Sequence, residues 1–124
     1  MTHRGWIITG GIMGALGVAL GAFGAHGLSA TLEASGRAGT FDTATQYHLV
    51  HALALVLAGV LAERLPGRWT RLAGWLFLVG VALFSGSLYV LAIFDVGFMG
   101  AVAPFGGAAL IGGWLCLARA AWDR

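Results

Sequence analysis

The chain has 124 residues, of which 59% are hydrophobic and 10% charged, and its formal net charge is +2. A water-soluble domain of this size cannot cover its surface with so few charged side chains, so the composition excludes an ordinary soluble protein. The single cysteine, Cys116, excludes a disulfide framework within one chain. No groove-reading motif accompanies the positive charge, so no nucleic acid is expected as a partner.

Four uncharged runs, at 5–32, 43–62, 72–94 and 96–118, are separated by the charged residues. Each run reaches the roughly 20 residues that cross a bilayer as a helix, and none shows the period-two alternation of barrel strands. The sequence therefore predicts an all-α integral membrane protein with a single membrane domain over 1–124. The expected architecture is an antiparallel bundle of four transmembrane helices with a short extracytoplasmic interfacial segment. The predicted spans are about 6–27, 43–62, 70–94 and 99–122.

The first predicted span carries glycines at spacings of four, three, four and three, which form a seam for close helix packing. These helix-packing residues are Gly10, Gly14, Gly17, Gly21 and Gly24. A second small face, with Gly11, Ala15, Ala22 and His26, lies roughly opposite. The two faces predict a central position in the bundle, with His26 buried or half-buried. A cleaved signal peptide is the alternative, although the uncharged stretch is too long for an ordinary signal core.

The connection 28–42 is the only one long enough to hold structure of its own. Ser29 is expected to cap a short interfacial helix that ends at Gly36, and Asp42 is expected to cap the second span. The later connections are short turns, which make sequential helices antiparallel neighbours.

The third and fourth spans also carry small-residue seams. Gly106 and Gly113 belong to a three-four seam for helix packing in the fourth span. Pro104 is expected to kink this span near its outer end, because proline removes a helix hydrogen bond.

Arginine positions predict the orientation of the chain in the membrane. Arg37 alone lies in the first connection. The other six lie at the chain ends and beside the middle connection: Arg4, Arg64, Arg68, Arg71, Arg119 and Arg124. This asymmetry predicts cytoplasmic N- and C-termini, which in a bacterium means residence in the cytoplasmic (inner) membrane. Trp6, Trp69 and Trp122 lie at the same ends, as in an interfacial aromatic belt.

Four ionisable side chains, His26, His48, His51 and Asp95, are expected in the outer half of the bundle. His51 lies eight residues past Thr43, about 12 Å into the membrane by helical rise. Ionisable groups at such depth are costly to leave unpaired, so they are candidate functional residues. These four side chains form the candidate polar site for a proton or a ligand.

Three interpretations of the candidate site are open. The site handles protons, or it binds a divalent metal ion, since His48 and His51 at i and i+3 place both rings on one face. Alternatively, each neutral imidazole bonds a carbonyl, serine or tyrosine on a neighbouring helix and fixes the register of the bundle. Two histidines at this spacing cannot ligate opposite faces of one haem. The sequence commits to no metal and no cofactor.

No serine lies in a Gly-x-Ser-x-Gly elbow and no acid/base pair is convincing, so the chain is not expected to be an enzyme. The leading expectation is a non-enzymatic helix-packing or accessory membrane protein. One alternative is a small oligomeric transporter or channel that uses the outer histidines for a proton or small cation. Another is a membrane protein that binds a metal or redox cofactor. The expected partners are the lipid bilayer and a second copy or another membrane protein.

Four ordered motifs extend over nearly the whole chain. They are ALGAFGAHGL (19–28), FDTATQYH (41–48) with HALAL (51–55), FSGSLY (84–89) and PFGG (104–107). Together they resemble the small membrane proteins grouped as domain of unknown function 423, which are related to eukaryotic transmembrane protein 256. The resemblance implies a four-helix membrane protein without an established activity. Ala103 stands where threonine is expected from the family, so no role is assigned to a hydroxyl there.

Overall fold

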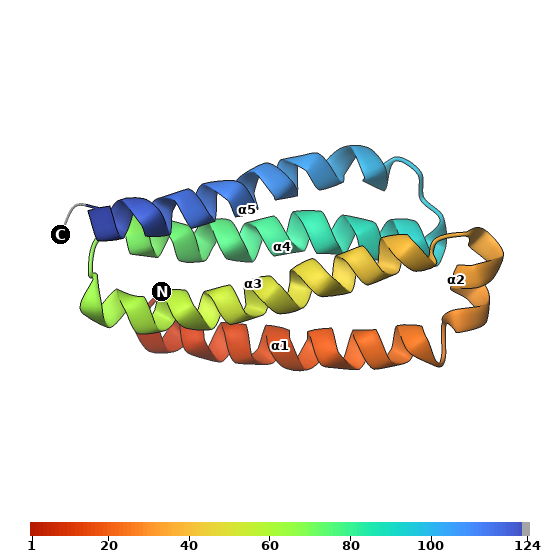
Figure 1. The fold of residues 1–124 in the computed structure, drawn as a ribbon, viewed down its shortest axis with the longest axis horizontal. Coiled ribbons are helices and arrows are strands. Elements are labelled where there is room, and N and C mark those ends of the chain that lie inside the picture. The colour runs from red at the N-terminus through yellow and green to blue at the C-terminus, as the bar shows by residue number, and fades with distance from the viewer. Residues whose placement is uncertain (123–124) are drawn as a thin grey trace.

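The computed structural model describes residues 1–122, and its regular structure is entirely helical. The helices are α1 (His3–Ala25), α2 (Ser29–Ser35), α3 (Ala38–Arg64), α4 (Arg68–Phe94) and α5 (Met99–Trp122). Four of them, α1, α3, α4 and α5, are long and apolar enough to cross a membrane, and they alternate in direction (Figure 1). The all-helical membrane fold with four spanning helices is thereby confirmed. Arg124, which entered the arginine count, lies outside the described residues.

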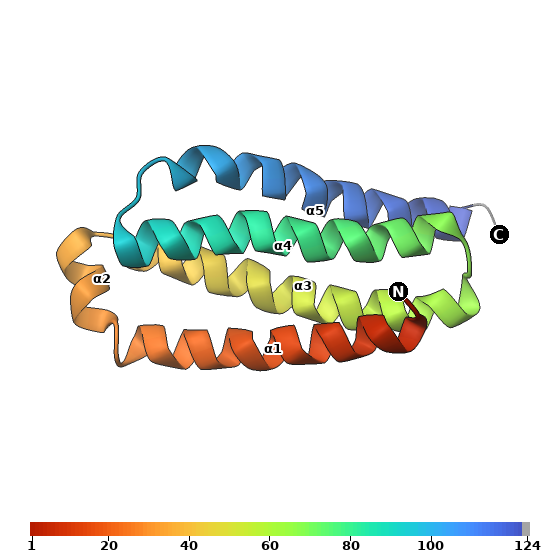
Figure 2. The ribbon, with the colours of Figure 1, turned by 180° about the vertical axis from the view of Figure 1, so that it is seen from behind.

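The four long helices form one strip in the order α1, α3, α4, α5, which both views show (Figures 1 and 2). Close backbone contacts join neighbouring helices, whereas within residues 1–122 α1 and α5 lie at opposite edges without a comparable interface. The predicted central position of α1 is therefore wrong. Among the described helices only α3 packs extensively along α1, so the second small face with Gly11, Ala15 and Ala22 is exposed at the edge of the strip.

The glycine seam of α1 lies against α3. A Cβ at Gly10 would lie 2.8 Å from the carbonyl oxygen of Ala52, and a Cβ at Gly17 would lie 2.7 Å from the side chain of Leu49. The remaining seam glycines, Gly14, Gly21 and Gly24, face Ala52, Thr45 and Phe41 of α3. The two backbones approach this closely because no side chain stands between them.

Two glycines of α5 have the same function against α4. A Cβ at Gly106 would overlap the backbone nitrogen of Phe84, and a Cβ at Gly113 would lie 2.6 Å from the ring of Phe77. Phe77 is fully buried and belongs to the larger hydrophobic core cluster. The α5 helix continues through Pro104 without interruption.

Trp6 links α1 directly to α4. Its side chain is 1% exposed, and a Cβ at Gly74 would lie 2.6 Å from the indole. The ring also meets Trp75 edge-on, with ring centroids 5.2 Å apart. The indole of Trp6 is buried between the helices because the glycine at position 74 leaves room for it, and its depth at the membrane interface stays a prediction.

The connection after α1 contains the short helix α2, and Gly36 ends it in the left-handed conformation with φ of 70°. The two predicted caps are wrong. Ser29 is the first residue of α2, and its hydroxyl donates to the carbonyl of His26 at 3.1 Å. Asp42 lies inside α3, which already begins at Ala38. The left-handed turn redirects the chain early enough for α3 to gain an extra turn before Asp42.

Candidate functional site

The four candidate residues lie in separate places. His48 and His51 are buried in α3, whereas His26 and Asp95 are exposed just beyond the ends of α1 and α4. The burial predicted for His26 is wrong, because α1 ends at Ala25 and the helical spacing no longer applies to the next residue. Within residues 1–122, no group of three or more His, Cys, Asp or Glu side chains is arranged to hold a metal ion.

His48 joins three helices through its two ring nitrogens. Nε2 lies 2.8 Å from the carbonyl oxygen of Met13 in α1, and Nδ1 lies 2.8 Å from the hydroxyl of Tyr89 in α4. Since a carbonyl only accepts hydrogen bonds, Nε2 carries a proton and donates it. Nδ1 of the neutral ring then accepts from the hydroxyl of Tyr89. Gly17 makes room for this ring, because a Cβ there would lie 3.3 Å from Cδ2 of His48.

His51 joins α3 to α5. Its Nε2 lies 3.0 Å from the indole nitrogen of Trp114, and its Nδ1 lies 2.8 Å from the carbonyl oxygen of Tyr47. An indole N–H only donates, so Nε2 is unprotonated and accepts, while Nδ1 donates to the carbonyl. His51 is therefore the neutral Nδ1–H tautomer, whereas neutral His48 is the Nε2–H tautomer.

Aromatic rings from three helices surround His51. The ring of Trp114 meets it edge-on at 5.8 Å between centroids, and Phe77 of α4 contacts both rings at 5.7 and 5.0 Å. Tyr47 stacks on His51 at 6.0 Å with an interplanar angle of 11°. These contacts hold the imidazole in one orientation. A hollow of about 210 Å³ beside it is lined by Gln46, Tyr47, Val50 and His51.

The two histidines differ in what they can do chemically. Protonation of His51 would place an N–H on Nε2 opposite the N–H of Trp114, so that hydrogen bond would be lost. Protonation of His48 at Nδ1 would keep the bond to Met13, and the oxygen of Tyr89 would accept instead of donating. Every ring nitrogen already has a partner, so neither imidazole presents a free lone pair to a metal ion.

Two partners of the histidines, Trp114 and the carbonyl of Met13, are missed by the sequence reasoning. Trp114 lies in the middle of a span, away from the membrane interfaces where tryptophan is enriched, and this position was an available signal. No such signal marks the carbonyl of Met13, because every residue of a helix has a backbone carbonyl. Tyr89, in contrast, is recognisable as a polar group in the outer half of its span.

Asp95 forms an ion pair with Arg37 instead of approaching the buried histidines. Its Oδ1 accepts from Nη2 of Arg37 at 3.0 Å and from Nε at 3.3 Å. The pair connects the residue before α3 to the residue after α4. Asp95 has a φ of 55°, which makes it the one non-glycine residue with positive φ in the described part of the chain.

The sequence matches known proteins over most of its length. A sequence model of the family described as "Protein of unknown function (DUF423)" matches residues 20–107. The chain is a member of the DUF423 family. The UPF0382 membrane protein YwdK of Bacillus subtilis (strain 168) is 43% identical over 117 residues, which cover 94% of each chain. The UPF0382 inner membrane protein YgdD of Escherichia coli (strain K12) is 39% identical over 114 residues, which cover 92% of this chain and 86% of its own. No solved structure matches.

The DUF423 match covers part of the histidine network. Residues 20–107 contain both buried histidines, Tyr89 and Asp95, whereas Met13 and Trp114 lie outside the matched stretch. The names of the relatives describe membrane proteins, and that of YgdD describes an inner membrane protein. This DUF423 protein is accordingly a membrane protein from a family of unknown function.

Proposed function

We propose that this DUF423 protein is a non-enzymatic membrane protein that acts as an accessory partner by packing against another transmembrane helix. The observation that carries the proposal is that the buried histidines are engaged in holding the fold together. His48 bonds groups on α1 and α4, and His51 bonds Trp114 on α5. The most polar side chains of the interior thus serve helix packing.

The edge of α1 is the face proposed for the partner. Gly11, Ala15 and Ala22 are exposed there, and a Cβ at Gly11 would meet no atom within 4 Å. Small residues at spacings of four and seven allow a second helix backbone to approach closely. The inner seam of the same helix packs on α3 by this means. The proposed occupant of the edge is therefore a transmembrane helix, from a second copy or from another membrane protein.

Cysteine cross-linking in native membranes tests the partner face. In a Cys116→Ser background, Ala15→Cys is expected to cross-link to a neighbouring helix. Ile111→Cys is the matched control, because Ile111 is 63% exposed on α5, at the opposite edge of the strip. Equal cross-linking at the two positions would contradict a specific interface at the edge of α1.

Substitution of the histidines tests whether they serve the fold. A glutamine amide can donate to Met13 from position 48 and can accept from Trp114 at position 51, whereas leucine can do neither. We expect the free energy of unfolding of His48→Gln and of His51→Gln to stay within about 1 kcal/mol of wild type. The free energy of unfolding of the leucine variants should be lower by roughly a further 1–2 kcal/mol. Unfolding in mixed detergent micelles measures the difference. Loss of a cellular phenotype in a stably folded His48→Gln variant would contradict a purely structural role.

A second candidate function, a small oligomeric proton carrier, is favoured by His48. Its Nδ1 can take up a proton without loss of the bond to Met13, since Tyr89 can reverse its donor role. Proton flux in reconstituted vesicles that is present in wild type and absent in His48→Gln would establish this function. Vesicles without flux at any protein density would remove it.

A further inference from the structure

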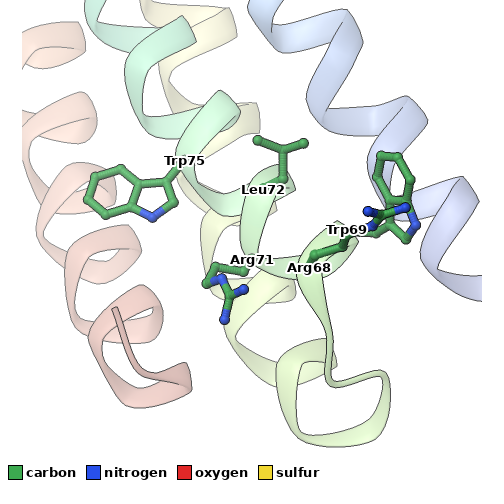
Figure 3. Close-up of a pocket in the computed structure, with 5 residues that line it drawn as sticks. All are labelled: Arg68, Trp69, Arg71, Leu72 and Trp75. Atoms are coloured by element: carbon green, nitrogen blue, oxygen red, sulfur yellow. The ribbon is translucent and has the colours of Figure 1, made fainter.

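A shallow hollow of about 400 Å³ lies over the first turns of α4, at the end of the strip that also carries the N-terminus (Figures 1 and 3). It is lined by Arg68, Trp69, Arg71, Leu72 and Trp75. Figure 3 shows Leu72 between the two indoles, with Trp75 extending toward α1 and Trp69 lying beside Arg68 on the side of α5. Basic and aromatic side chains therefore surround an apolar floor.

Two arginines make this hollow positively charged. Arg68 and Arg71 are exposed, and within residues 1–122 neither forms an ion pair. The guanidinium of Arg68 lies over the ring of Trp69, 4.7 Å from its centroid. Glu63, the acidic residue nearest in sequence, is already 3.1 Å from His3. The described chain thus supplies no anion to these two guanidinium groups.

The start of α4 reinforces this charge. Gly67 precedes the helix and provides no side-chain cap, so the first backbone N–H groups have no side-chain acceptor among residues 1–122. The N-terminus of a helix carries partial positive charge and attracts anions such as phosphate. The helix end adds to the attraction that the two arginines already exert.

An exposed apolar track leads from the hollow along α4. Leu72, Trp75, Val79 and Leu83 follow each other at spacings of three and four, and each is between 37% and 47% exposed. A ligand that satisfies both parts of the surface has an anionic head and a long apolar chain. Free phosphate would leave the track unused, and an uncharged lipid would leave the arginines unused.

We propose that this hollow binds an anionic glycerophospholipid, with its phosphate between Arg68 and Arg71 and an acyl chain along Leu72 and Trp75. Basic sites on transmembrane helices are suited to anionic lipid headgroups, and interfacial indoles lie at headgroup level. The site lies on α4, apart from the edge of α1, so it is independent of the proposed accessory function.

Native mass spectrometry of the delipidated full chain tests the site. Phosphatidylglycerol and phosphatidylcholine with identical acyl chains are titrated in the same detergent. We expect wild type to bind phosphatidylglycerol at least about tenfold more tightly, and Arg68→Gln/Arg71→Gln to lose this preference. The control Arg4→Gln/Arg64→Gln removes the same charge from the same end of the strip, and its affinity is expected to stay within about twofold of wild type.

Three results would overturn the assignment. The first is equal binding of both lipids by wild type. The second is a loss of affinity in the control as large as that in the Arg68→Gln/Arg71→Gln variant. The third is displacement of phosphatidylglycerol by glycerol 3-phosphate, which would make the hollow a phosphate site without a lipid chain. If Arg68→Gln/Arg71→Gln fails to fold, the salt dependence of lipid binding by wild type still tests the proposal. Salt raised from about 50 to 500 mM must weaken binding of phosphatidylglycerol and spare phosphatidylcholine.

Discussion

Trp114 donates its indole proton to Nε2 of His51 across 3.0 Å, and this bond joins α5 to α3 over the intervening α4. A residue 63 positions away along the chain thereby sets the tautomer of a buried histidine. The bond also places Trp114 against Phe77, which lies in the core on α4. One indole thus connects three helices.

Trp114→Phe keeps an aromatic ring and removes the donor. We expect the free energy of unfolding to fall by about 1 kcal/mol, since interhelical hydrogen bonds in membranes contribute about that much. The ¹⁵N chemical shifts of His51 should also change as Nε2 loses its donor. Trp122→Phe is the control, because Trp122 is 82% exposed. Unchanged stability and unchanged shifts in Trp114→Phe would show that the bond contributes nothing.

Gly10 and Gly11 offer a test of helix packing with two adjacent residues. A Cβ at Gly10 would lie 2.8 Å from the carbonyl of Ala52 and 2.9 Å from the backbone nitrogen of Val56, whereas a Cβ at Gly11 would have no atom of another helix within 4 Å in the described part of the chain. We expect Gly10→Ala to destabilise by roughly 1–3 kcal/mol, because backbone atoms cannot move aside easily. Gly11→Ala should stay within about 0.5 kcal/mol of wild type in micelle unfolding. Equal effects would contradict the α1–α3 contact.

Asp95 is expected to contribute to stability more through its backbone conformation than through its ion pair with Arg37. The carboxylate is 68% exposed, so the bond to Arg37 should contribute at most about 1 kcal/mol. Asp95→Ala should cost about 1–2 kcal/mol, because alanine is unfavourable at a φ of 55°. Asp95→Gly should be close to neutral in thermal unfolding. A glycine variant as unstable as the alanine variant would assign the stability to the ion pair instead.

The predicted orientation can be checked with a membrane-impermeant maleimide on intact cells. In a Cys116→Ser background, Ser35→Cys in α2 should react from outside, because the distribution of arginines predicts that this end of the strip faces outward. Thr2→Cys, at the opposite end, should react only after permeabilisation. The reverse labelling pattern would contradict cytoplasmic termini.

The spanning helices and their glycine contacts depend on local patterns, so they are largely predictable. Apolar length determines which segments cross the membrane, and the three-four spacing of Gly10 to Gly24 predicts one close-packing face. The first and last residues of the helices are harder to predict from the sequence, as Asp42 illustrates. The left-handed turn at Gly36 lets α3 start earlier than a cap-based prediction allows.

What lies against each helix face depends on the tertiary arrangement, and the spacing of residues along the sequence carries no information about that arrangement. The second small face of α1 suggests a neighbour, but the pattern cannot say whether that neighbour belongs to the same chain. The spacing predicts His26 on this face, but the helix ends one residue before it. The pairing of His51 with Trp114 requires the mutual position of α3 and α5, and no periodicity within either helix specifies that position.

The strip arrangement has a consequence for permeation. Helices in a row expose two broad sides and two margins to the bilayer, whereas a ring of helices encloses a lumen. Because the first and last spanning helices of the described chain do not meet, the spans of one copy do not form a ring. Any aqueous conduit would have to be closed by several copies side by side. A single copy isolated in a lipid nanodisc would then hold a ligand or a lipid without conducting anything.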